Sequence, residues 1–425
     1  MTALPEQARQ RALLLALEGP DPDWQASLAE LALLADTAGV EVVGTVTQKR
    51  EAPDPVYFVG KGKAQEVRQI AGEAGADVLL VDGDLTPTQQ RNLEDAAGLG
   101  VLDRSGLILD IFAQRARSRE GKLQVELAQL SYLLPRLTGR GTELSRLGGG
   151  IGTRGPGETK LEVDRARIRR RIGVLRKQVA RIGKRRALER RSRQEAGAPV
   201  AALVGYTNAG KSTLLNALSD ADVLVEDRLF ATLDPTIRRV ELPGGRQVLF
   251  ADTVGFIRNL PPQLVAAFRA TLEEVAQADV LVHVVDASHP QMEEQITTVR
   301  RVLHELGCAD RPTVMALNKI DAVADRAALD ARVQREPHGV AISALRGDGL
   351  RELLDLVRER LEQELLPVEV TLSWDAQDLL DEAHQRGRVL AEEFTKEGVA
   401  LNARVPEDLA GRLRRAASRR SADAD

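Results

Sequence analysis

Short apolar runs and amphipathic stretches alternate along most of this chain. Apolar runs that end at a turn or a polar residue predict buried strands, at 40–43, 77–81, 200–204, 248–251 and 313–317. Stretches near 26–37 and 64–74 have the spacing of helices that bury one face. Strands that alternate with helices are typical of α/β domains built on a mostly parallel sheet.

The middle of the chain follows a different rule, because its apolar residues repeat at alternating four- and three-residue steps. That spacing predicts two helices that pack along each other, the second from about 159 to 193 and roughly 50 Å long at about 1.5 Å per residue. The apolar residues of the two stretches are Leu123, Leu127, Leu130, Leu134 and Leu137, and Leu161, Ile168, Ile172, Leu175, Val179 and Ile182.

The formal net charge of −4 hides a strong polarity along the sequence. Residues 136–193 hold 19 Lys and Arg against 5 Asp and Glu, so this segment carries +14 and the remainder −18. Like charges this dense repel one another on a bare helix. We therefore expect a phosphate backbone to neutralise them, with a solvated helix face as the alternative.

A glycine-rich loop at 148–158 separates the two predicted helices. Such a loop has little structure of its own, so it can insert into a crevice and bring its backbone close to RNA. It need not be a second nucleotide site, because no strand precedes it. The expected RNA contacts on the loop and the following helix are Gly149, Gly150, Arg154, Gly155, Lys160, Arg169 and Arg170.

Composition narrows the class of protein. Hydrophobic residues make up 43% of the chain, which is enough for packed cores, and no apolar run is long enough to span a membrane. The single cysteine, Cys308, excludes an intramolecular disulfide and a cysteine metal cluster. The apolar run at 13–17 is too short for a signal peptide. We expect a cytoplasmic protein, and a monomer, because a hairpin folded on itself leaves no obvious dimer seam.

Residues 205–212 read Gly-Tyr-Thr-Asn-Ala-Gly-Lys-Ser, the pattern of a phosphate-binding loop. The apolar run before it and the helical stretch 213–218 after it give the strand–loop–helix context that this pattern requires. Main-chain N–H groups would hold phosphate, Lys211 would reach the β- and γ-phosphates, and Ser212 would ligate Mg²⁺. An ordinary glycine turn before a helix is the alternative.

Three further motifs follow in order. Residues 252–255 read Asp-Thr-Val-Gly, whose carboxylate would hold Mg²⁺ through water and whose glycine would meet the γ-phosphate. Residues 318–321 read Asn-Lys-Ile-Asp, whose carboxylate would accept from the N1–H and exocyclic amine of guanine, a donor pair that adenine lacks. Ser-Ala at 343–344 would complete the base pocket. Each motif alone is weak, but the ordered set is specific for a GTPase.

A switch loop at 230–236 should supply a second Mg²⁺ ligand. Thr232 and Thr236 compete for this role, and we favour Thr232. The residues expected to act in catalysis are Lys211, Thr232 and Gly255, and the expected metal ligands are Ser212, Thr232 and, through water, Asp252. The full set expected to bind GTP is Gly205, Tyr206, Thr207, Asn208, Ala209, Gly210, Lys211, Ser212, Thr213, Phe230, Ala231, Thr232, Leu233, Asp234, Asp252, Thr253, Val254, Gly255, Asn318, Lys319, Ile320, Asp321, Ser343, Ala344 and Leu345.

Phe256 stands where many small GTPases have a glutamine that orients the attacking water. An aromatic ring cannot orient water by hydrogen bonding, so we expect slow hydrolysis until a partner, another group or a bound cation completes the site. The side-chain oxygen of Asn208 is a candidate ligand for such a cation, K⁺. An asparagine that is simply solvated in its loop is an equal alternative.

These observations predict a multidomain α/β protein in which a P-loop GTPase domain follows an N-terminal α/β domain and a basic helical hairpin. A small C-terminal α/β unit would contain strands at 368–372 and 398–403, a helix near 376–388, and a disordered tail from 419. The N-terminal part shows no catalytic constellation, and its stretch 60–63 is a better match for an exposed turn than for an anion site. The predicted segments are 1–115, 116–197 for the two-helix coiled hairpin, 198–365 for the GTPase domain, and 366–425.

Long strings of this sequence also resemble those of HflX-type GTPases, translation factors of the ribosome. The resemblance covers nearly the whole chain, least distinctly at the C-terminal unit, and it supports Thr232 as the metal ligand. It implies that the hairpin approaches the peptidyl-transferase region of the large ribosomal subunit, and that this subunit stimulates the GTPase. The strings are 53–63, 108–116, 122–130, 148–160, 205–213, 230–234 and 252–257.

The resulting hypothesis is a Mg²⁺-dependent GTPase, with K⁺ as a second candidate cation, whose partners are GTP or GDP and the large ribosomal subunit with its rRNA. It would split or rescue stalled or idle ribosomes, and hydrolysis would drive its release. The alternative is an RNA-binding assembly factor of the large subunit that uses the GTPase domain as a nucleotide sensor. A P-loop kinase would leave Asn318 and Asp321 without a role.

Overall fold

The contacts of the chain divide it into two compact units. The computed structural model describes residues 9–19, 23–137, 156–195, 198–219, 229–230, 232, 236–258, 274–363, 365–395 and 398–423. The four predicted segments are smaller than the two units, and their boundaries stay a prediction. The first unit comprises Met1–Ile182, Arg228–Leu233 and Asn259–Arg269, and the second comprises Gly183–Asp227, Asp234–Arg258 and Ala270–Asp425.

The first unit contains a four-stranded parallel sheet. Its strands are β1 (Arg11–Glu18), β2 (Glu41–Lys49), β3 (Val78–Val81) and β4 (Gly100–Asp103), in the order β2-β1-β3-β4. Strand β1 is buried along most of its length because it pairs with β2 on one side and β3 on the other. The run 13–17 was considered in the sequence only as a possible signal peptide, so this central strand was missed.

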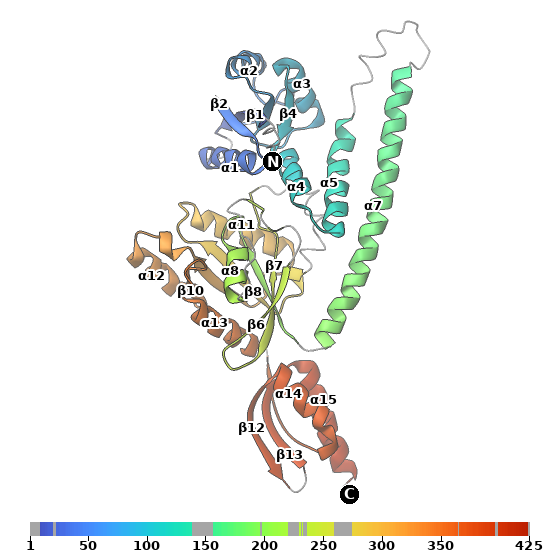
Figure 1. Cartoon of the computed structure of the whole chain (residues 1–425), viewed down its shortest axis with the longest axis vertical. Coiled ribbons are helices and arrows are strands. Elements are labelled where there is room, and N and C mark those ends of the chain that lie inside the picture. Colours follow the sequence, from blue (N-terminus) through green and yellow to red (C-terminus); the bar gives the residue numbers. More distant parts are fainter. Residues whose placement is uncertain are drawn as a thin grey trace, which may run out of the picture. The chain divides into compact units, whose positions relative to one another are not determined.

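Helices surround this sheet (Figure 1). Side chains of α2 and α3, among them Val67 and Leu93, form one hydrophobic core with Leu13 and Leu15 of β1. Helix α1 also buries leucines, Leu31 and Leu34. The long helix α7 covers the stretch predicted at 159–193 and extends beyond both ends. The helices up to residue 195 are α1 (Trp24–Thr37), α2 (Lys61–Ala74), α3 (Pro87–Ala97), α4 (Arg104–Arg115), α5 (Arg119–Arg136) and α7 (Pro156–Glu195, 40 residues). Helix α7 passes from the first unit into the second after Ile182.

Helix α5 has two contact faces, of which the leucine spacing predicted one. Arg171 of α7 makes a bidentate ion pair with Glu126 of α5, with both N–O distances 2.7 Å, so the two helices lie side by side there. A second face of α5 is more deeply buried, and there Tyr132 donates a hydrogen bond to Asp103 at the end of β4 (2.7 Å). This second face packs on the sheet of the first unit. Its buried residues are Gln124, Val125, Ala128 and Tyr132.

The second unit contains a six-stranded sheet in the order β10-β9-β8-β5-β7-β6, in which only β6 and β7 pair antiparallel. Apolar residues of α8 and α13 cover one face and those of α11 and α12 the other. Its strands are β5 (Val200–Gly205), β6 (Thr236–Glu241), β7 (Gln247–Asp252), β8 (Val280–Asp286), β9 (Thr313–Asn318) and β10 (Gly339–Ala341). Its helices are α8 (Lys211–Leu218), α11 (Met292–Glu305), α12 (Arg326–Gln334) and α13 (Leu350–Gln363).

A three-stranded antiparallel sheet, in the order β11-β13-β12, ends the second unit. Helices α14 and α15 lie on one face of this sheet (Figure 1), where Leu409 and Leu413 pack on Leu401. Helix α15 reaches Asp423, so the expectation of a disordered tail from 419 is not met. The elements are β11 (Leu366–Leu372), α14 (Gln377–Arg386), β12 (Arg388–Thr395), β13 (Gly398–Val405) and α15 (Glu407–Asp423). In the part of the chain that the structure describes, no helix has the length and apolar character needed to cross a membrane.

Candidate functional site

The loop between β5 and α8 has a backbone conformation that requires glycine at position 210. Gly210 has φ +92°, and a Cβ built there would lie 2.3 Å from Nδ2 of Asn318. Asn208 stands exposed on the loop with φ +62°, a left-handed conformation that asparagine adopts more readily than most residues. The role of Asn208 as a K⁺ ligand stays a prediction.

Lys211, the first residue of α8, is buried within this loop. Its Nζ donates to the carbonyl oxygens of Tyr206 (2.8 Å) and Gly205 (3.2 Å). Burial lowers the pKa of Lys211 to about 8, and the Asp252 carboxylate acts in the opposite direction. The buried ammonium group is near carbonyl oxygens and one carboxylate. A bound phosphate would stabilise its charged form further, through charge-assisted hydrogen bonds.

Two of the expected metal ligands already lie together. Ser212 donates a hydrogen bond from Oγ to Oδ2 of Asp252, at 2.7 Å. Asp252 is the last residue of β7 and is almost fully buried. A hydroxyl in the first turn of α8 and a carboxylate oxygen at the end of β7 are the hard donors that Mg²⁺ prefers, so the residues present fit this ion.

Asn318, the last residue of β9, joins the phosphate loop to the loop that carries Ser343. Its Nδ2 donates to the carbonyl of Ala209 (2.9 Å), and its Oδ1 accepts from the N–H of Ala344 (2.9 Å). The side chain is almost fully buried. Asn318 therefore holds two nucleotide loops in register, a role that the order of the motifs did not reveal.

The expected base-binding carboxylate, Asp321, is held by Ser343. The Oγ of Ser343 donates to Oδ1 of Asp321 (2.5 Å), and this hydrogen bond is the main cause of the lowered pKa of Asp321. Lys319, in a left-handed conformation, pairs with Asp286 at the end of β8 (2.7 Å). Asp286 was missed in the sequence, although a polar residue at the end of an apolar strand was the available signal. Ser343 and Ala344 are buried, whereas the side chain of Leu345 is exposed.

The segment 252–256 packs tightly on the phosphate loop. A Cβ on Gly255 would lie 2.8 Å from Cα of Thr207 and 3.0 Å from Nζ of Lys211. The Phe256 ring is 2% exposed, and its backbone pairs with the loop through Thr207 N to Phe256 O (2.8 Å) and Phe256 N to Gly205 O (3.0 Å). Phe256 is therefore a packing residue that anchors one nucleotide segment on another, and it directs no polar group at a reacting phosphate.

Of the switch residues that the structure describes, Phe230 and Thr232 belong to the first unit and Thr236 to the second. Phe230 packs edge-to-face on Phe112 of α4, with ring centroids 4.6 Å apart and an interplanar angle of 62°. Thr232 is half-buried, and the rival Thr236 begins β6, exposed and in register with Asp252. The choice between the two threonines stays a prediction. The remaining expected residues of this loop, Ala231, Leu233 and Asp234, lie outside the described residues.

Among the expected RNA contacts, Arg169 and Arg170 are exposed on α7. The side chain of Lys160 is not part of the described structure. Four others, on the glycine-rich loop, lie outside the described residues: Gly149, Gly150, Arg154 and Gly155.

The fold and the site together define a P-loop GTPase: a phosphate loop between strand and helix, Ser212 hydrogen-bonded to the aspartate at the end of β7, and an Asn-Lys-x-Asp loop after β9. Family models cover almost the whole chain. They match as GTP-binding GTPase N-terminal at 25–113, GTP-binding GTPase Middle Region at 115–193, 50S ribosome-binding GTPase at 200–319, and HflX C-terminal domain at 328–424.

Curated relatives agree with these models. A GTPase HflX of Caldanaerobacter subterraneus subsp. tengcongensis is 48% identical over 96% of this chain and 93% of its own length. A GTPase HflX of Escherichia coli is 44% identical over 94% of each chain. The chain belongs to the HflX family of GTPases.

A solved structure of a GTP-binding protein from Sulfolobus solfataricus in complex with GDP is 26% identical. The alignment covers 83% of this chain and 98% of that one, with a TM-score of 0.44. The family assignment rests on the sequence relatives and not on this superposition.

Proposed function

We propose that this GTPase is Mg²⁺-dependent, binds the large ribosomal subunit through the basic hairpin and glycine-rich loop, and splits or rescues stalled or idle ribosomes. Hydrolysis of GTP drives its release. The observation that carries the proposal is the combination, in one chain, of a P-loop GTPase domain whose candidate site residues are joined by hydrogen bonds and a 40-residue helix rich in arginine. The name of the matching central family, 50S ribosome-binding GTPase, supports the same partner.

In this proposal Ser212, Thr232 and Asp252 hold Mg²⁺, the last of them through water. The ion neutralises charge that develops on the phosphate oxygens during hydrolysis. Lys211 binds the β- and γ-phosphates, and its displacement from the loop carbonyls is offset by charge-assisted hydrogen bonds. Asp321 reads guanine, and Asn208 is the candidate ligand for K⁺.

The binding surface for RNA is the exposed face of α7, where Arg169 and Arg170 stand free of the core. Guanidinium groups on a long helix neutralise phosphates without reading bases, so this contact supplies affinity and orientation. Arg154 on the glycine-rich loop supplies a further contact within the subunit. The protein acts in the cytoplasm as a monomer.

The packing of Phe256 supports slow hydrolysis by the free protein, because this residue leaves no side chain to orient water. The test is GTP turnover by purified protein with and without large subunits, in K⁺ and in Na⁺ buffer. We expect weak turnover alone and strong stimulation by the subunit. Fast turnover without the subunit would contradict the role given to Phe256.

Splitting is measured separately, by adding protein and GTP to purified intact ribosomes and following their dissociation in a density gradient. We expect free subunits to accumulate. The rival function, an assembly factor of the large subunit, predicts subunit binding and stimulation without dissociation. Arg154→Ala should weaken splitting and spare intrinsic turnover.

A further inference from the structure

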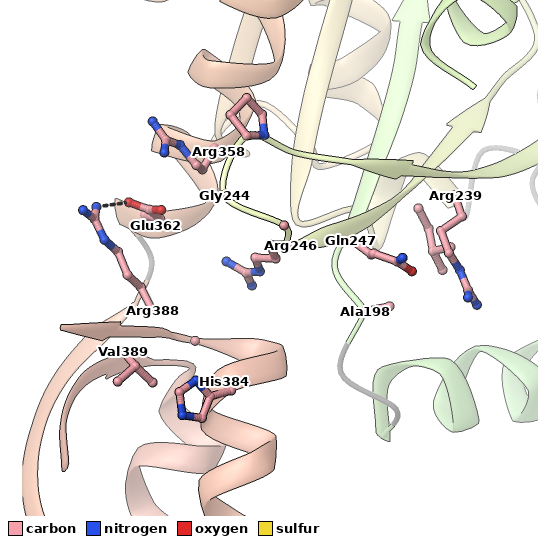
Figure 2. A pocket seen from close by; sticks show the side chains of 14 residues that line it. Ala198, Arg239, Gly244, Arg246, Gln247, Arg358, Glu362, His384, Arg388 and Val389 are labelled. Atoms are coloured by element: carbon pink, nitrogen blue, oxygen red, sulfur yellow. Dashed lines mark hydrogen bonds and ion pairs between the residues drawn. The ribbon is translucent and has the colours of Figure 1, made fainter. Parts of the chain in front are cut away.

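A cleft with a volume of about 880 Å³ opens in the second unit (Figure 2). It lies at the start of β7, whereas Asp252 of the candidate nucleotide site ends that strand. The turn between β6 and β7 forms one wall, the last turns of α13 form another, and the end of α14 with the start of β12 closes it. The residues that line it are Ala198, Arg239, Pro243, Gly244, Gly245, Arg246, Gln247, Leu249, Arg358, Glu362, His384, Gly387, Arg388 and Val389.

The lining carries an excess of positive charge. Four arginines and one glutamate give a formal charge of +3 with His384 neutral, on a protein whose net charge is −4. The carboxylate of Glu362 is already engaged, since it accepts from Nη1 of Arg388 at 2.6 Å. The side chain of Arg239 is exposed and makes no hydrogen bond or ion pair with any residue that the structure describes, although its backbone lies in the β6–β7 ladder. Arg358 pairs only with Asp355 of its own helix, a partly exposed contact of small strength.

Arg246 lies between the two sheets, at the centre of the cleft (Figure 2). Its Nη2 donates to the backbone carbonyl of Arg386 (2.8 Å), but its buried Nε and Nη1 have no hydrogen-bond partner in the described structure. Burial lowers the pKa of Arg246 from its ordinary value, and nearby Arg386 adds to this effect against the opposite influence of Glu362 and Asp279. A buried guanidinium with unused donors is costly unless an anion approaches it.

The chemistry of the lining identifies the kind of anion. Among the described residues of the cleft there is no Phe, Tyr or Trp, so the large aromatic rings on which nucleobases commonly stack are absent from it. Guanidinium forks match phosphate oxygens. The turn glycines, Gly244 and Gly245, have open space where a side chain would stand, which lets a polymer backbone come close. We propose that this cleft binds the phosphate groups of an RNA backbone, without reading sequence, as a second RNA contact of the protein.

The position of the cleft in the chain supports RNA over a free phosphate compound. Helix α7 ends at Glu195, three residues before Ala198 of the cleft wall, and three residues span at most about 11 Å. The last turns of α7 belong to the same unit and carry exposed Lys184 and Arg185. An RNA strand that follows α7 would therefore meet the cleft next. The inference rests on the proposed function, because it assumes that α7 binds RNA.

The test is equilibrium binding of a fluorescent single-stranded RNA of 20 nucleotides to the full-length, GDP-saturated protein between 50 and 200 mM KCl. Each phosphate contact contributes about 0.7 to the slope of log K against log salt for a single strand. The double variant Arg239→Ala/Arg358→Ala should flatten the slope by about 1.4. Neither side chain bonds across the cleft, so the fold should persist.

A matched control removes two exposed arginines outside the cleft, Arg335→Ala/Arg351→Ala, and should change the slope by less than half as much. Glu362→Gln is the complementary variant. It removes the negative charge that pairs with Arg388 and should steepen the slope and tighten RNA binding, which damage to the fold would not produce.

Equal slopes in the cleft variant and the control would overturn the inference. A further arm adds inorganic pyrophosphate to the GDP-saturated protein without RNA. If pyrophosphate raised the melting temperature of wild type but not of the cleft variant, while RNA slopes stayed equal, the ligand would be a free phosphate compound and the RNA assignment would be wrong. Failure of every form, wild type included, to bind RNA or large subunits would instead overturn the proposed function.

Discussion

The side-chain amide of Asn318 lies 2.9 Å from the carbonyl oxygen of Ala209, so a residue of the base-recognition motif holds the phosphate loop directly. The same side chain accepts from Ala344 N–H, also at 2.9 Å. Three segments far apart in sequence are thus fixed by one buried amide. We therefore expect binding of the base and binding of the phosphates to depend on each other, because a shift of either loop would break an Asn318 hydrogen bond.

Asn318→Ala should weaken GTP and GDP alike. Two hydrogen bonds are lost and buried backbone groups are left without partners, at a cost of about 2–3 kcal/mol, or roughly 30- to 150-fold in affinity. The measurement is titration with fluorescent GDP and GTP analogues. Asn402→Ala, on an exposed position of β13, is the control and should bind as wild type does. A loss confined to GTP would show that Asn318 does not act through the two loops.

Nucleotide affinity should fall as the pH rises through 8. The pKa of Lys211 is lowered to about 8 by burial in the free protein, and bound phosphates raise it because they favour the charged form. Binding must therefore take up a proton above pH 8, and GDP affinity should drop roughly fourfold between pH 7 and 8.5.

The control for this pH effect is Lys211→Arg, since arginine stays charged over the whole range. Its affinity should be lower at the outset and the same at pH 7 and 8.5. The guanine base and the phosphates of GDP titrate in the same way with both proteins. Any difference between the two pH profiles of GDP affinity is therefore caused by residue 211. Parallel profiles would mean that Lys211 is fully protonated in the free site at pH 8.5.

How far the sequence could predict this molecule depended on the range of the interactions. The α/β class, the strand before each motif and the long basic helix were predictable, because apolar spacing and loop patterns are local. The run 13–17 was not recognised as a central strand, since its burial comes from pairing with β2 and β3. The partners of Asn318 and the pairing of Lys319 with Asp286 were also out of reach, because they depend on the order of strands in the sheet.

Asp321→Asn should relax the selectivity for guanine. An amide in place of the carboxylate cannot accept from both the N1–H and the exocyclic amine, so the preference for GTP over ATP should fall by at least 100-fold. Ser343→Ala keeps the carboxylate and loses only the hydrogen bond that orients it and lowers its pKa, so its loss of selectivity should be about tenfold smaller. Competition of ATP against labelled GTP measures both. An unchanged preference in Asp321→Asn would contradict the base-pocket assignment.

Gly210→Ala should abolish nucleotide binding. The new methyl would lie 2.3 Å from Nδ2 of Asn318, in a backbone with φ +92° that alanine rarely adopts. Gly307→Ala is the control, because it has the same kind of backbone strain, at φ +71°, but open space around the new methyl group. It therefore separates the effect of backbone strain from that of steric overlap. We expect Gly307→Ala to lower stability by about 1 kcal/mol and to bind GDP normally. Equal GDP affinities for the two variants would mean that the loop yields easily at Gly210.

Asp103→Ala should destabilise the first unit. The carboxylate is fully buried and accepts from Tyr132 Oη (2.7 Å), Arg136 Nη2 (2.8 Å) and two backbone N–H groups, those of Gly106 (2.8 Å) and Leu85 (3.1 Å). Removing one partner of a buried pair leaves the other charge uncompensated, so we expect a loss of about 3–5 kcal/mol in the free energy of unfolding.

The two tryptophans report on different units, Trp24 on the first and Trp374 on the second. In a Trp374→Phe background, the fluorescence of Trp24 during urea unfolding therefore reports the stability of the first unit, which contains Asp103. Asp110→Asn, at an exposed position of α4, is the control and should change stability by less than about 0.5 kcal/mol. Because Asp103 bonds to none of the expected nucleotide residues that the structure describes, GDP affinity of the folded variant should equal that of wild type. An equal shift for both variants would show that the Asp103 bonds contribute little, and that α5 is held to the sheet by its apolar face alone.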